Sequence, residues 1–114
     1  MPPKRNPLNL NPLQLKTLTL LQELARLAGA PAAEEDGGGI AIREFPQAHG
    51  DHFHLGDALV AARDASGLHN PSVWMALERK GLIRPKPPDA MILTELGQRY
   101  ETGLRETILN RGGH

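Results

Sequence analysis

The chain has 114 residues, no cysteine and a formal net charge of zero at pH 7. This length fits one compact domain with a single core, and the absence of cysteine excludes disulfides and thiolate metal ligands. No apolar run approaches the length of a membrane-spanning helix, about 18 residues, and no apolar stretch typical of a signal peptide follows the first residues. We therefore expect a cytoplasmic single-domain protein with no membrane partner.

The charges are unevenly distributed along the chain. Residues 1–33 carry a net charge of +3, residues 34–67 carry −5 and residues 68–114 carry +2. A polyanion-binding domain usually has an overall basic bias. Only the two ends of this chain could therefore offer a basic surface to nucleic acid.

The first predicted element is a helix over residues 11–28. Asn11 is suited to cap it, and Pro12 fits the first helical position, where its missing N–H costs nothing. Leucines recur along the segment at helical spacing and also beside that row, so we expect burial on more than one face. Gly29 is predicted to end the helix, and residues 30–39 are predicted as a loop.

Two short strands joined by a turn are predicted between residues 40 and 57. Ile40 and Ile42 lie on one face of the first strand, and Phe53 and Leu55 lie on one face of the second. This two-residue period is typical of half-buried strands. Both strands are predicted to belong to one small antiparallel sheet.

Two helices are predicted next. The first covers residues 57–67, begins at Asp57 and directs Leu59 and Val60 into the core. The second begins at another Asn-Pro pair, residues 70–71, which repeats the signal of the first helix.

The remaining chain predicts a strand, a proline-rich turn, a strand and a last helix. Apolar residues 82–83 and 91–93 form the two strands, and the prolines between them cannot donate ladder hydrogen bonds. Thr94 is predicted to cap a helix over residues 94–110. One stripe of that helix is apolar and consists of Leu96, Tyr100, Leu104 and Ile108.

Two segments of this region, ALERKGLIRP (Ala76–Pro85) and ILTELGQRY (Ile92–Tyr100), carry a resemblance to a known fold. They resemble the end of the recognition helix and the strand-to-helix segment after the wing in the winged helix-turn-helix superfamily of bacterial transcriptional regulators. The resemblance covers roughly residues 53–102, with residues 11–28 as the first helix, and it indicates a fold rather than a function.

The resemblance implies an α+β winged helix. It would have about four helices and a small antiparallel sheet, with an extra N-terminal hairpin strand. The domain would cover residues 11–110, preceded by a flexible arm (residues 1–10) and followed by a flexible tail (residues 111–114).

The resemblance also implies a DNA-binding surface. The helix Pro71–Lys80 would take the place of the recognition helix, and Arg84–Asp89 the place of the wing. With Trp74 and Leu77 facing the core, the outward residues would be Ser72, Val73, Met75, Ala76 and Arg79. Weak base contacts are expected from Ser72 and Met75. Phosphate contacts are expected from Arg79, Lys80, Arg84, Lys86, Lys4 and Arg5.

Protein partners are the alternative. An outward apolar surface of Val73, Met75 and Ala76 would suit a protein at least as well as DNA. The predicted helix over residues 94–110 is longer than a small core requires, which favours a homodimer formed through it.

A cluster of His49, Asp51, His52 and His54 is the densest group of chemically capable side chains in the chain. Two imidazoles on one strand face and a third ligand from the turn could bind a divalent ion. The simpler interpretation is a strand that buries Phe53 and leaves its polar positions in solvent. We favour the strand and predict neither a metal nor another cofactor.

No serine has a recognisable histidine and acidic partner, and no pair of carboxylates stands out. We therefore expect no enzyme. Two functions remain: a winged-helix DNA-binding protein acting as a small transcriptional regulator, and a winged-helix module that binds a protein without binding DNA.

Overall fold

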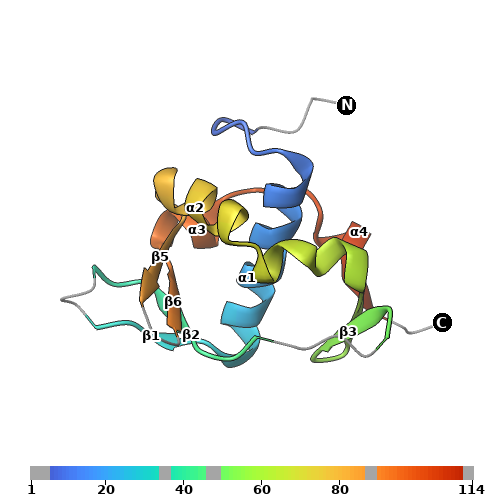
Figure 1. Ribbon diagram of the computed structural model, residues 1–114. Helices are drawn as coiled ribbons and strands as arrows, with labels where there is room; N and C mark the ends of the chain where they lie inside the picture. Colours follow the sequence, from blue (N-terminus) through green and yellow to red (C-terminus); the bar gives the residue numbers. More distant parts are fainter. Residues whose placement is uncertain (1–5, 34–36, 46–49, 87–89, 112–114) are drawn as a thin grey trace.

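The computed structural model describes residues 6–33, 37–45, 50–86 and 90–111 (Figure 1). The predicted site residues Lys4, Arg5 and His49 lie outside the described residues, as do residues 87–89 of the predicted wing. The described residues form an α+β fold, as predicted, but with two antiparallel sheets in place of the one small sheet that was expected. In this part of the chain no helix is long and apolar enough to cross a membrane.

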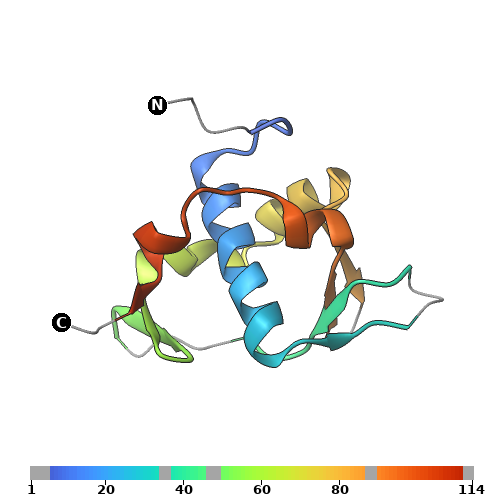
Figure 2. The same ribbon diagram turned by 180° about the vertical axis from the view of Figure 1, so that it is seen from behind.

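The helix α1 (Pro12–Ala28) is the central element of the fold, and Figures 1 and 2 show it running between the two sheets. It begins as predicted, with Asn11 as its cap. The Asn11 side chain accepts a hydrogen bond from the Gln14 N–H at 2.8 Å, and the Gln14 side chain accepts one from the Asn11 N–H at 3.0 Å. Burial on more than one face is confirmed, because the buried residues are Thr17, Leu18, Thr19, Leu20, Leu21, Glu23 and Leu24.

The larger sheet contains four strands in the order β1, β2, β6, β5, and each neighbouring pair is antiparallel. The strands are β1 (Ala30–Pro31), β2 (Ile40–Ile42), β5 (Ile83–Lys86) and β6 (Ala90–Leu93). The predicted strands around Ile42, Ile83 and Met91 are therefore confirmed. Pro85 lies inside β5 rather than in the turn, and β5 tolerates it because an edge strand need not donate every ladder hydrogen bond.

The smaller sheet contains β3 (His52–Leu55), β4 (Ala58–Ala61) and β7 (Asn110–Arg111) in that order. The strand β3 pairs with β4, and the residue Phe53 stands opposite Val60. The strand β3 does not pair with β2, so the prediction that both strands belong to one sheet is wrong.

The predicted helix over residues 57–67 is also wrong in its first half. Gly56 adopts a left-handed φ of 59° and forms a tight turn with Asp57, so Asp57 is a turn residue and not a helix cap. Val60 is buried whereas Leu59 is 41% exposed. This alternation is the two-residue period of a strand, which the adjacent pair Leu59 and Val60 concealed.

The second half of that segment is the 3-10 helix η2 (Ala62–His69), which packs against α1. The contact is close at Gly67, where an added Cβ would lie 1.9 Å from the Thr17 Oγ1. The helix α2 (Pro71–Arg79) follows η2 and begins at the predicted Asn-Pro pair. The Asn70 side chain accepts a hydrogen bond from the Ser72 N–H at 2.9 Å.

The single helix predicted over residues 94–110 is replaced by two short helices, α3 (Glu95–Arg99) and α4 (Arg105–Ile108). Thr94 caps α3 as predicted, because its hydroxyl accepts a hydrogen bond from the Gly97 N–H at 3.0 Å. The chain then leaves the helical path, and Gly103 adopts a left-handed φ of 74°.

The residues between α3 and α4 cross over α1 (Figure 2). There the Thr19 hydroxyl donates to the Thr102 hydroxyl at 2.6 Å. The predicted stripe is divided accordingly, since Tyr100 and Ile108 are buried while Leu96 is 44% exposed. The homodimer through residues 94–110 stays a prediction. The long continuous helix on which that prediction was based is not present.

Residues 6–10, part of the predicted arm, pack against the domain. Leu10 is buried, and the Leu8 N–H donates a hydrogen bond to the Tyr100 hydroxyl at 3.1 Å. The Tyr100 hydroxyl in turn donates to the Asn6 side chain. These contacts tie the start of the described chain to the C-terminal end of α3.

Candidate nucleic-acid interface

The candidate interface is built on α2, which packs against α1 and β5. Leu77 faces the core as predicted and is fully buried. Val73 was predicted to face outward, and this is wrong, because it is buried as well. Residues four apart lie on one helix face, so the pair of Val73 and Leu77 forms the buried row and Trp74 lies half-buried beside it.

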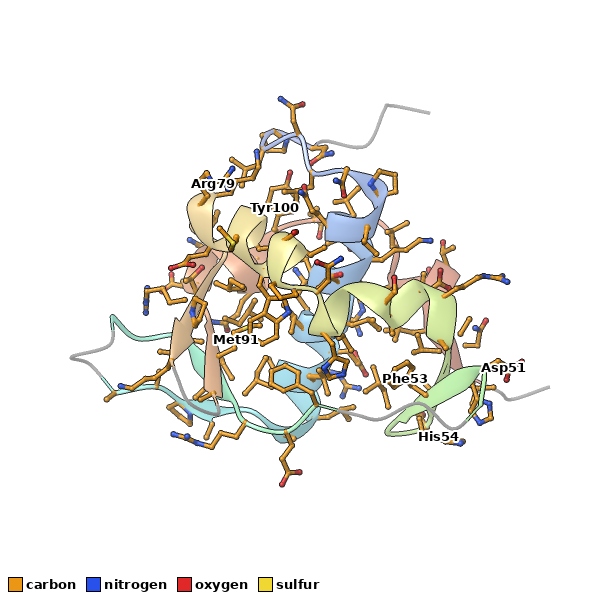
Figure 3. All side chains as sticks on the ribbon, viewed as in Figure 1. Asp51, Phe53, His54, Arg79, Met91 and Tyr100 are labelled. Carbon is orange, nitrogen blue, oxygen red and sulfur yellow. The ribbon has the colours of Figure 1, made fainter. Side chains whose placement is uncertain are left out.

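The exposed face of α2 carries Ser72, Met75 and Arg79. Met75 is 58% exposed, more than any other large apolar side chain among the described residues. Figure 3 shows Arg79 at the outer end of α2, well separated from Asp51 and His54. Ser72, Met75 and Arg79, three of the residues predicted to contact DNA, therefore lie together on the exposed face of α2.

Two of the predicted phosphate contacts are held by backbone carbonyls. The Lys80 ammonium donates a hydrogen bond to the Leu8 carbonyl at 2.7 Å. The Arg84 guanidinium, on β5, donates to the Gly38 carbonyl at 3.2 Å. Both side chains are half-buried, so part of their hydrogen-bonding capacity is used within the protein.

Lys86 lies at the end of β5 and is exposed. Because α2 packs against β5, the structure brings four predicted basic residues to two neighbouring elements: Arg79, Lys80, Arg84 and Lys86. Such a group of charges can contact phosphates but carries no base specificity.

A pocket beside α2 was not predicted from the sequence. It has a volume of about 380 Å³, and its lining residues are Phe45, Leu68, His69, Pro71, Trp74, Met75, Glu78 and Pro85. Sequence reasoning placed Trp74 in the core and gave Phe45 no role. The two rings lie 5.5 Å apart between centroids, at an interplanar angle of 48°. The only signal for the pocket is an aromatic residue just after β2, and its partner is distant in the sequence.

The histidine cluster lies on the β3–β4 hairpin, away from α2 (Figure 3). The His52 and His54 rings contact each other edge to face, with centroids 4.9 Å apart, and the His52 Nδ1 lies 3.3 Å from the Asp51 carboxylate. Among the residues that the structure describes, no three histidine or acidic side chains are arranged to hold a metal ion. His49 lies outside that part of the chain.

A buried carboxylate lies on α1, on the side of the molecule that the C-terminal segment covers. The Glu23 side chain is 1% exposed and forms ion pairs with Arg26 and with Arg105, the latter at 3.2 Å. The hydrogen bond and the charge of Glu23 raise the pKa of Arg26. This cluster fastens α4 to α1 and uses two of the chain's basic side chains for structure.

Comparison of the chain with models of protein families, with curated proteins and with solved structures finds no match. The interpretation of the site therefore depends on its geometry and charges.

Proposed function

We propose that the protein is a winged-helix DNA-binding protein that acts as a small transcriptional regulator. In this proposal α1, η2 and α2 are the three helices of the helix-turn-helix unit, and α2 is the recognition helix. The strand β2 and the hairpin β5–β6 form the small sheet, and Arg84–Asp89 takes the place of the wing. The smaller sheet, β3–β4–β7, is an addition to this unit.

The observation that carries the proposal is the order of the three strands β2, β6, β5 beside α2. In a winged helix the first strand pairs with the last, so that the hairpin projects next to the recognition helix. The pairing of β2 with β6 and the packing of α2 on β5 support that arrangement here. The basic residues of α2 and β5 would then face one DNA backbone.

The contact residues differ in their expected roles. Arg79 is exposed and would approach phosphates directly. Lys80 and Arg84 would add charge from their positions on the carbonyls of Leu8 and Gly38, and Lys86 would add charge from the end of β5. Ser72 is the polar residue nearest the start of α2 and would make weak base contacts together with Met75. We therefore expect sequence preference to be small compared with overall affinity for DNA.

The test is fluorescence anisotropy of a labelled mixed-sequence duplex at two salt concentrations. Affinity for DNA is expected to fall steeply as salt rises, because phosphate contacts release counterions. Substitution of Arg79 by alanine is expected to weaken binding and to reduce the slope of log affinity against log salt by about 1.

Arg99→Ala is the matched control. Arg99 is an exposed arginine on α3 that pairs with Glu95 on its own helix, at 3.5 Å, so its removal is expected to leave both affinity and slope unchanged. Absence of measurable binding at low salt would overturn the DNA-binding proposal.

A second candidate, a protein-binding module, is favoured by the exposure of Met75 beside an apolar pocket. Binding through an apolar surface would be nearly insensitive to salt, because it releases no counterions. Retained binding of a protein partner at high salt by a chain that does not bind DNA would support this candidate.

A further inference from the structure

The pocket beside α2 has the size and lining of a small-molecule site. Its volume of about 380 Å³ lies in the range of ligand pockets, roughly 300–1,000 Å³. Most of its described lining is apolar, and the polar side chains there are those of His69 and Glu78. In an apolar site, a few polar groups are what fixes the orientation of a bound ligand.

The aromatic wall of the pocket is fixed in position. The Trp74 Nε1–H donates a hydrogen bond to the Leu68 carbonyl at 3.0 Å, which holds the indole against η2. Phe45 packs on the indole in a tilted arrangement. Because the indole N–H is already used, Trp74 offers a ligand its ring and no hydrogen bond. A flat apolar ring is the group that such a wall accepts best.

The negative charge of Glu78 determines which polar group a ligand with an aromatic ring would carry. Glu78 lies four residues after Trp74, one helical turn further along the same face of α2. Its exposed carboxylate attracts a cation and repels an anion, and the neighbouring indole face also attracts a cation. A carboxylate or phosphate on the ligand would meet unfavourable charge at this position.

We propose that this pocket binds a small aromatic cation, with the aromatic ring against Phe45 and Trp74 and the ammonium group on the Glu78 carboxylate. Met75 belongs both to the pocket wall and to the exposed face of α2. Provided that α2 contacts DNA as proposed above, a ligand in the pocket competes with DNA for the same helix, and the protein is a ligand-responsive regulator.

The test of the site uses probes of nearly equal shape: 2-phenylethylamine, 2-phenylethanol and 3-phenylpropionate. Binding is followed by the NMR signal of the indole N–H, which reports on one site because Trp74 is the sole tryptophan of the chain. For fragments of this size we expect dissociation constants on the order of 1 mM for the amine. The alcohol is expected to bind about 5-fold more weakly, and the carboxylate more weakly again.

Two variants separate the charge from the ring contact. Glu78→Gln removes the charge of an exposed residue and is expected to abolish the preference for the amine over the alcohol while leaving the affinity of the alcohol unchanged. Phe45→Ala is expected to weaken all three probes, with its folding checked by circular dichroism. Equal binding of the three probes, a preference that survives in Glu78→Gln, or no binding of any probe would overturn the proposed site.

Competition is measured separately, by DNA anisotropy with 2-phenylethylamine at a saturating concentration and ethylamine at the same concentration as the control for ionic strength. Release of DNA by the aromatic amine alone is the expected result. Bound probe with no DNA affinity would contradict the DNA-binding proposal and leave the pocket standing. If the protein binds DNA but none of the probes, the proposed ligand site is wrong and the DNA-binding proposal stands. If DNA and the aromatic amine bind at the same time, the proposed competition between them is wrong.

Discussion

The helices α1 and α2 begin with the same Asn-Pro pair but lie in different surroundings. The 17 residues of α1 are surrounded by other elements, and seven of them are buried. The 9 residues of α2 bury Val73 and Leu77, and the rest of the helix meets solvent or the pocket. The shared start signal therefore fixes where each helix begins. The rest of the sequence decides whether the helix serves as core or as surface.

The largest effect is expected from a core substitution in α1. Leu21 is fully buried, so Leu21→Ala should lower the free energy of unfolding by about 2–5 kcal/mol through lost burial and the cavity left behind. Urea denaturation followed by circular dichroism measures this change. A cost as small as that of an exposed position would contradict the central place of α1.

A smaller loss is expected at the contact of α1 with η2. A Cβ on Gly67 would overlap the Thr17 hydroxyl, so Gly67→Ala should destabilise by about 1–3 kcal/mol. That hydroxyl has no hydrogen-bond partner among the described atoms. In the Thr17→Ala background the added methyl group finds more room, and the cost of Gly67→Ala should fall. A double-mutant cycle with no coupling between the two positions would show that the contact is not tight.

The two caps provide a direct comparison of the helices. Asn11→Ala and Asn70→Ala should each cost about 1 kcal/mol in the free energy of unfolding. The two losses should be similar, because each substitution removes one side-chain acceptor, whereas the Asn11 backbone N–H can still donate to the Gln14 side chain. Asn→Asp at each position keeps the acceptor and serves as the control. A clear loss at one position and none at the other would contradict the equivalence of the two caps.

The smallest effect is expected on the exposed face of α2. Met75→Ala should change the free energy of unfolding by no more than about 0.5 kcal/mol, because the side chain is mostly in solvent. Urea denaturation measures this change. A larger decrease in the free energy of unfolding would mean that Met75 packs against the rest of the protein, and that the exposed face of α2 is not available for a ligand.

Local signals predicted much of the fold. Asn11, Asn70 and Thr94 cap helices as expected from their residue types and positions, and the period of Ile40 and Ile42 identified β2. These features depend on residues within one helical turn or one strand. The exposed positions of Ser72, Met75 and Arg79 on α2 could be identified for the same reason, whereas Val73, predicted to face outward, is buried.

What the sequence did not reveal depends on contacts between distant residues. The crossing of the C-terminal segment over α1 is accompanied by the hydrogen bond between Thr19 and Thr102, and a stripe of apolar residues cannot indicate it. The pocket needs Phe45 beside Trp74, and neither residue signals the other. The turn at Gly56 was missed because two adjacent apolar residues fit a helix as well as a strand.

The hydrogen bond from Lys80 to the Leu8 carbonyl has a practical consequence for work on this protein. It places the start of the described chain next to the end of α2, within reach of the surface proposed to meet DNA. An affinity tag fused upstream of Asn6 would be tethered beside that surface and could compete with a binding partner. Figures 1 and 2 show α4 and β7, the last elements of the described chain, on the far side of α1 from this surface, so a C-terminal tag is the better choice for binding measurements.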